Sequence, residues 1–108
     1  MNFETGSATL TGDSKHQVSN LDMILKAYPK ARIKIGGYTD KTGDDAVNKK
    51  LSDDRAKAVA TSLKADGSVA AQVTGSEGYG SQFAKQPVTA SDEERKTDRR
   101  ISVQLAEK

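Results

Sequence analysis

The stretch from Arg32 to about Ala65 constrains the fold of this chain most, because a strand pattern and a helix pattern follow each other across one short loop. Arg32-Ile33-Lys34-Ile35 alternates polar and apolar residues, as in a half-buried strand, and the strand continues through Gly36-Gly37-Tyr38. Thr42-Gly43-Asp44-Asp45 is a turn that offers acidic caps to a helix. That helix is predicted from about Asp45 to Ala65, with an apolar side formed by Val47, Leu51, Val59 and Leu63.

Arg55 lies on this predicted helix at a position where a charge is unexpected. It comes four residues after Leu51 and four before Val59, and at about 100° per residue Asn48 falls in the same sector. An arginine on such a stripe either meets a buried acid or points into a pocket. Asp40, at the other end of the loop, is the nearest acid of interest. Together the two charges can grip a ligand that carries both an ammonium and a carboxylate, or they can pair with each other and join the loop to the helix.

The N-terminal part of the chain predicts a strand followed by a helix. Residues 2–10 resemble a short strand with a turn at Gly6-Ser7, and Thr11-Gly12-Asp13-Ser14 supplies candidate N-caps for the helix. Pro29 ends that helix. Its apolar stripe consists of Val18, Leu21, Ile24, Leu25 and Tyr28.

The C-terminal part predicts two further strands. Residues 73–79 form one of them, and residues 81–97 are a polar loop with a short helical turn near residues 91–94. Residues 100–105 alternate cleanly and form the last strand. The order β-α-β-α-β-β predicts an α/β sandwich, in which the helices pack on one face of a small mixed sheet.

Composition excludes several classes of function. The 108 residues are expected to form one domain, residues 1–108, and the net charge of +2 is too weak to imply a polyanionic partner. There is no cysteine, and the single histidine, His16, makes no convincing metal site, so we expect no cofactor. The basic residues 95–100 lack interleaved aromatics and are diluted by acids, so we expect no nucleic acid partner. No apolar run approaches the roughly 20 residues of a membrane span. We therefore expect a domain of a longer protein, with any signal or membrane anchor outside this chain.

Four groups of residues, spread over nearly the whole chain, resemble the motifs of one family: Ser7-Ala8-Thr9-Leu10; Ile35-Gly36-Gly37-Tyr38-Thr39-Asp40 with Gly43, Asn48, Leu51-Ser52, Arg55-Ala56 and Val59; Gly78-Tyr79-Gly80; and Asp98-Arg99-Arg100-Ile101. The chain resembles the OmpA-like peptidoglycan-binding domain. The second group is the most specific, because several spaced residues agree at once. The resemblance implies a non-catalytic periplasmic module that holds the cell wall without covalent bonds, through the diaminopimelate of the peptidoglycan stem peptide. It also implies a parent protein, and possible protein partners, in the cell envelope.

The resemblance assigns a role to each candidate residue. Asp40 would hold the ammonium of the ligand and Arg55 its carboxylate. Thr39, Asn48 and the backbone near Leu51 would support these two residues. This assignment agrees with the chemistry of the side chains, since a guanidinium binds a carboxylate bidentately and a carboxylate accepts hydrogen bonds from an ammonium.

The closing motif would contribute Arg99, which is expected to flank the site. The chain departs from the family nearby at Asp98, where an asparagine is usual, and this acid could pair with a neighbouring arginine. It also departs at Thr5, usually an aromatic residue, and at Gly6, often Asp or Asn. Glycines 36 and 37 are expected to allow close packing of the backbone. Tyr38 and Tyr79 are expected to be aromatics at the edge of the core rather than a platform for sugar stacking.

Two other functions remain open from the sequence. The chain can be a protein-interaction module of the same fold, with a wall site that is vestigial or regulated by a partner. It can also be a wall hydrolase that uses carboxylates, but the sequence argues against this function because its acids form no recognisable acid–base pair.

Overall fold

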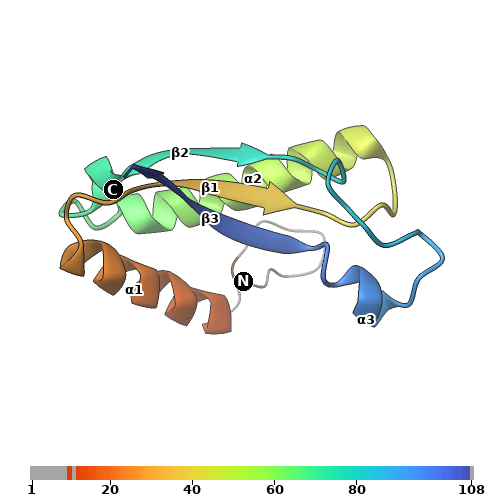
Figure 1. The fold of residues 1–108 in the computed structure, drawn as a ribbon, viewed down its shortest axis with the longest axis horizontal. Helices are drawn as coiled ribbons and strands as arrows, with labels where there is room; N and C mark the ends of the chain where they lie inside the picture. Colours follow the sequence, from red (N-terminus) through yellow and green to blue (C-terminus); the bar gives the residue numbers. More distant parts are fainter. Residues whose placement is uncertain (1–9, 11, 108) are drawn as a thin grey trace.

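The computed structural model describes residue 10 and residues 12–107, whose arrangement is shown in Figure 1. The predicted first strand, residues 2–10, lies outside the described residues except for Leu10. The other predicted elements are confirmed, with bounds close to those expected. They are α1 (Gly12–Ala27), β1 (Arg32–Tyr38), α2 (Asp45–Lys64), a short 3-10 helix η1 (Ala70–Gln72), β2 (Val73–Gly78), α3 (Asp92–Arg95) and β3 (Arg100–Glu107).

The strands of the described residues form a mixed sheet, which confirms the predicted α/β class. Their order is β2-β1-β3, and the central strand β1 is parallel to β2 and antiparallel to β3. Ile33 and Ile35 point to the same face of β1, because side chains alternate along a strand, and both are buried. They share one hydrophobic core with residues of α1 and α2, so both long helices pack on this face (Figure 1).

The core is largest where the second half of α2 crosses the sheet. The buried apolar residues are Leu10, Val18, Leu25, Ile33, Ile35, Ala56, Val59, Ala60, Leu63, Val69 and Val73. Two residues of the predicted α1 stripe are exposed instead: Ile24 by 54% and Tyr28 by 66%. Together with Val103 and Leu105 of β3 they line an apolar groove of about 740 Å³, which no described residue fills.

The first half of α2 approaches the sheet closely because two strand positions lack a side chain. A Cβ on Gly37 would lie 2.3 Å from the backbone oxygen of Ser52, and a Cβ on Gly78 would lie 2.1 Å from the backbone nitrogen of Asp53. Ser52 is fully buried at this contact, as expected for glycine-mediated packing. The prediction that Val47 faces the core was wrong. The buried residues of α2 begin at Asn48, and Val47 is 61% exposed.

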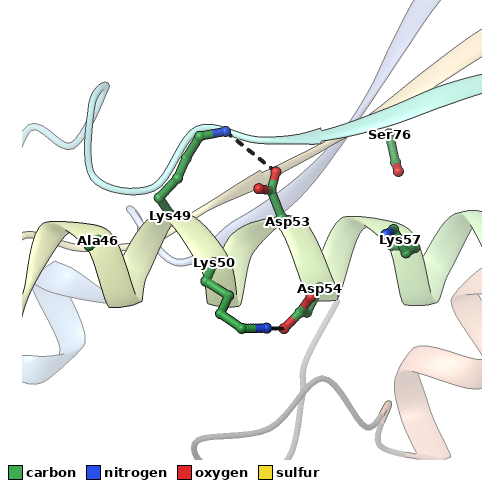
Figure 2. Close-up of a pocket in the computed structure, with 7 residues that line it drawn as sticks. All are labelled: Ala46, Lys49, Lys50, Asp53, Asp54, Lys57 and Ser76. Atoms are coloured by element: carbon green, nitrogen blue, oxygen red, sulfur yellow. Dashed lines mark hydrogen bonds and ion pairs between the residues drawn. The ribbon is translucent and has the colours of Figure 1, made fainter.

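Lys49 and Asp53 of α2 also fix the end of β2. The amide of Gly78 donates to Asp53 Oδ1 at 2.5 Å, and Lys49 Nζ donates to the carbonyl oxygen of Gly78. Figure 2 shows these two side chains meeting beside the end of β2, above a shallow hollow that Lys50, Asp54 and Lys57 also line. The helix and the strand ends are thus held together by side-chain hydrogen bonds as well as by packing.

Candidate functional site

The loop after β1 holds a buried carboxylate. Thr39 and Asp40 are only 5% and 3% exposed. The amide of Thr39 donates to the carbonyl oxygen of Gly80 at 2.8 Å, which ties the end of β1 to the residues that follow β2. Asp40 Oδ1 accepts hydrogen bonds from the amide of Thr42, at 2.9 Å, and from the Thr42 hydroxyl. The carboxylate therefore has a fixed position before any ligand arrives.

Asn48 supports this loop from the first turn of α2. Its Nδ2 donates to the carbonyl oxygen of Thr42 at 2.8 Å and lies 3.5 Å from the carbonyl oxygen of Asp40. Gly43, inside the loop, has a φ of +81°, a conformation that glycine adopts without strain. The structure thus gives Asn48 a positioning contact with the Asp40 loop.

Arg99 forms a close ion pair with Asp40. Its Nη1 donates to Asp40 Oδ2 at 2.8 Å and to Asp92 Oδ1 at 3.0 Å. Arg95 Nη1 lies 3.8 Å from the same oxygen of Asp40. The alternative prediction, an ion pair between Asp40 and Arg55 that joins loop to helix, stays a prediction, and the structure adds Arg99 and Arg95 as neighbours of the acid.

Arg55 is half-buried on α2 near this cluster, and Leu51, one turn earlier, is partly buried. Burial lowers the pKa of the Arg55 guanidinium, and repulsion from the charge of Arg99 lowers it further. Both guanidinium groups nonetheless remain protonated, because arginine does not lose its proton in proteins. Arg99 and Arg95 thus lie beside one buried carboxylate, and Arg55 lies close enough to Arg99 for their charges to repel each other.

Asp40 is ionised in this arrangement. Burial alone raises the pKa of its carboxyl group, but the hydrogen bonds from Thr42 and Arg99, with the charge of Arg99, outweigh burial and leave the pKa lowered. The negative charge is therefore present at any pH near neutrality.

Asp98 does not behave as the sequence suggested. Instead of an ion pair with a neighbouring arginine, its carboxylate accepts hydrogen bonds from the amides of Lys85, at 3.0 Å, and Gln86, at 2.9 Å. The side chain is 3% exposed. Burial tends to raise the pKa of Asp98, yet these amide donors bring it below the ordinary value. Asp98 thus holds the loop after β2 in place, and Arg99 pairs with Asp40 and Asp92 instead.

The sequence did not single out Arg95 or Asp92. Both lie on α3, whose start is fixed by a capping box in which Ser91 and Glu94 bond each other's backbone amides. The pattern Ser-x-x-Glu predicts such a cap, so the helical turn itself could be found from the sequence. The pattern does not predict that this turn lies beside Asp40. The departures at Thr5 and Gly6 lie outside the described residues.

The described residues offer no arrangement suited to a metal ion: no group of three or more His, Asp or Glu side chains comes together in residue 10 and residues 12–107. Within the same residues, no helix has the length and apolar character needed to cross a membrane.

The described residues thus form a small mixed α/β domain with a buried carboxylate and its arginine partner at one end of the sheet. Residues 2–100 match the model of the OmpA family, and the chain belongs to this family. Peptidoglycan-binding protein ArfA of Mycobacterium tuberculosis is 43% identical over 81 residues, which are 73% of this chain and 24% of that protein. The chain spans about a third or less of the length of the curated relatives it matches first.

Two solved structures share the fold over nearly the whole chain. The C-terminal domain of Helicobacter pylori MotB has a TM-score of 0.82 at 26% identity, covering 98% of this chain and 82% of that domain. The peptidoglycan-associated lipoprotein of Burkholderia pseudomallei has a TM-score of 0.72 at 27% identity, covering 95% of this chain and 84% of that one.

Proposed function

We propose that this domain binds peptidoglycan non-covalently through the diaminopimelate of the stem peptide. The observation that carries the proposal is the buried carboxylate of Asp40, which Arg99 contacts, with the half-buried guanidinium of Arg55 near Arg99. The free end of diaminopimelate bears one ammonium and one carboxylate on the same carbon. A site with fixed charges of both signs matches this zwitterion better than it matches a simple cation or anion.

Each charge of the ligand has a partner in the pocket. An ionised carboxylate offers about four acceptor positions, so Asp40 can accept an ammonium in addition to the hydrogen bonds from Thr42 and Arg99. Arg55 supplies the guanidinium for the ligand carboxylate, since a guanidinium and a carboxylate can form two parallel hydrogen bonds. Thr39 and Asn48 support the Asp40 loop through hydrogen bonds to its backbone, and the backbone near Leu51 is assigned a supporting role with them. None of these steps breaks a covalent bond, so the proposed module is not an enzyme.

The proposed role in the cell is a tether. ArfA is named for peptidoglycan binding, and the Burkholderia structure is a peptidoglycan-associated lipoprotein. By analogy, this domain holds an outer-membrane protein, a lipoprotein or an envelope complex to the wall from the periplasm. Attachment to a membrane would come from segments outside this chain.

Wall type tests the proposal directly. Purified sacculi with diaminopimelate in the stem peptide and sacculi with lysine in its place are sedimented with the protein, and the bound fraction is measured. Lysine lacks the second carboxylate, and an arginine left without its partner in a desolvated pocket is costly, so the diaminopimelate wall should bind distinctly better. Equal binding to both wall types would remove the assigned role of Arg55.

A second function is supported by the pair between Arg99 and Asp40. Because Arg99 already neutralises the acid at 2.8 Å, the pocket can be closed until an envelope protein moves the arginine, or it can be vestigial. The domain would then act as a protein-interaction module. Failure to bind either type of sacculus, with binding to envelope proteins retained, would favour this function.

A further inference from the structure

The face of the sheet opposite the helices carries an aromatic cluster, defined here as Tyr38, Tyr79 and Phe83. The rings of Tyr38 and Tyr79 stack with centroids 5.2 Å apart. Phe83 stands edge-on to both of them, at 6.2 Å and 5.6 Å. In Figure 1, α2 lies behind β1 and β2, so no described helix covers this face. The two tyrosines are half-buried and lie on the face of the sheet opposite the hydrophobic core.

The two tyrosine rings are already occupied on their faces. The guanidinium carbon of Arg100 lies 4.1 Å from the centroid of Tyr38, and Lys34 Nζ lies 5.9 Å from that of Tyr79. The stack rests directly on the sheet at Gly36, where a Cβ would lie 3.1 Å from the Tyr79 ring. Phe83 is different, because it is 51% exposed although it is anchored on both tyrosines. An apolar ring that packs on two other rings and is half open to water is a suitable surface for stacking.

Polar groups lie around Tyr38, the neighbour of this ring. Gln104 Nε2 donates to the Tyr38 hydroxyl at 3.2 Å, and Ser102 and the exposed Arg100 lie on the same face. An apolar ring beside amide, hydroxyl and guanidinium groups suits a pyranose sugar, which has an apolar C–H face and a rim of hydroxyl and N-acetyl groups. A purely apolar partner would take the exposed Arg100 out of water and offer it no hydrogen bond.

The cluster lies within reach of the proposed ligand site. Tyr38 is two residues from Asp40, a span of at most about 7 Å. Phe83 follows Gly80 by one turn, and Gly80 accepts the hydrogen bond from Thr39. In the wall polymer, diaminopimelate is the third residue of a peptide attached to the glycan, so the sugar lies on the order of 10 Å from the captured head group.

We propose that the aromatic cluster is a second contact for the wall polymer, in which Phe83 stacks on a sugar of the glycan strand. Arg100 and Gln104 contribute hydrogen bonds to that sugar. This inference rests on the proposed function, since the captured stem peptide is what brings the glycan to the cluster. According to this inference, the domain recognises the stem peptide together with its attached sugar, and not the peptide alone.

The test compares two soluble ligands by titration calorimetry. One is the stem peptide with diaminopimelate, and the other is the same peptide carried on its disaccharide. The protein should bind the disaccharide form roughly three- to tenfold more tightly, as expected for one stacking contact. Phe83→Ala should abolish this advantage and leave the affinity for the free peptide unchanged. Phe83→Tyr keeps a ring and should retain most of the advantage.

Val88→Ala is the matched control, because Val88 is an exposed apolar residue of the same loop and lies outside the cluster. It should bind both ligands as the parent does. Equal binding of the two ligands by the parent would overturn the inference and leave the proposed function standing. If neither ligand binds, the proposed function fails and the inference fails with it. If Phe83→Ala weakens both ligands equally, the ring supports the Asp40 pocket and does not contact the sugar, which also overturns the inference.

Discussion

The two halves of α2 are buried against the same sheet, but different interactions hold them there. In the second half, Val59, Ala60 and Leu63 fill the hydrophobic core. In the first half, the buried residues are Asn48 and Ser52, which hydrogen-bond to the loops at the ends of β1 and β2. The two halves therefore differ in what they hold: the apolar half anchors the helix in the core, and the polar half positions the loop that carries Asp40.

The largest effect on stability is expected in the apolar half. Leu63 is 1% exposed, and Leu63→Ala should lower the free energy of unfolding by about 2–5 kcal/mol, because the lost contacts leave a cavity. Urea unfolding followed by circular dichroism measures this loss, and the transition should stay single and cooperative. Binding to sacculi at a temperature where the variant is folded should equal that of the parent. Weakened binding by the folded variant would show that the two halves are not independent.

The largest effect on binding is expected at the polar end. Asp40→Ala and Arg55→Ala should each weaken binding to diaminopimelate sacculi by at least about 30-fold, because each leaves one ligand charge unpaired in a partly desolvated site. The two losses should be less than additive in the double variant, since both act on one ligand head group.

Melting of the same variants separates binding from structure. Asp40→Ala also removes the acceptor for Thr42 and Arg99, so some loss of stability is expected with it. Arg55→Lys is the sharper control, because it keeps the charge and loses only the fork of donors that grips a carboxylate. Parent-like binding by a folded Arg55→Ala variant would remove Arg55 from the site.

The same contrast explains which features the sequence could predict. Alternation in residues 32–35 and helical spacing in residues 45–65 report burial of apolar groups, so the elements and their order were predictable. Val47 was misplaced because burial at the polar end follows glycine contacts, which have no periodic pattern. The residues around Asp40 were predicted from their resemblance to the family motifs. The hydrogen bond between Arg99 and Asp40 joins positions 59 residues apart, so no local sequence pattern predicts it.

An intermediate effect on stability is expected at Asp98. Like the polar half of α2, this residue is a buried polar group that holds a loop, here the loop after β2. Asp98→Asn replaces one acceptor oxygen by a donor that faces a backbone amide, so it should lower stability at neutral pH by about 1–3 kcal/mol. The pKa of Asp98 is lowered in the folded state, so its charge stabilises the fold above the ordinary carboxyl pKa of about 3.9.

This contribution is lost as the pH falls through the lowered pKa of the folded state. The gap in stability between the parent and Asp98→Asn should thus be constant above about pH 5 and shrink in more acidic solution. Urea unfolding of both proteins across this range measures the gap. The other carboxyl groups are common to both proteins and cancel. A gap that stays constant into acid would mean that the Asp98 charge does not act through the amides of Lys85 and Gln86.

The smallest effect is expected on the solvent side of α2, where charge pairs resemble those of the polar end but lack burial. Lys50 and Asp54 form an ion pair at 3.1 Å with side chains 78% and 45% exposed (Figure 2). Water and salt screen such a pair, so Lys50→Ala should change stability by less than about 0.5 kcal/mol.

One turn along the helix surface, Asp53 is similarly exposed but accepts a hydrogen bond from the amide of Gly78 at 2.5 Å. Asp53→Ala should thus cost more than Lys50→Ala, because it frees a backbone donor at the strand end. Thermal melting of the two variants side by side measures this order, and equal melting temperatures would show that the Gly78 bond contributes no more than a surface ion pair.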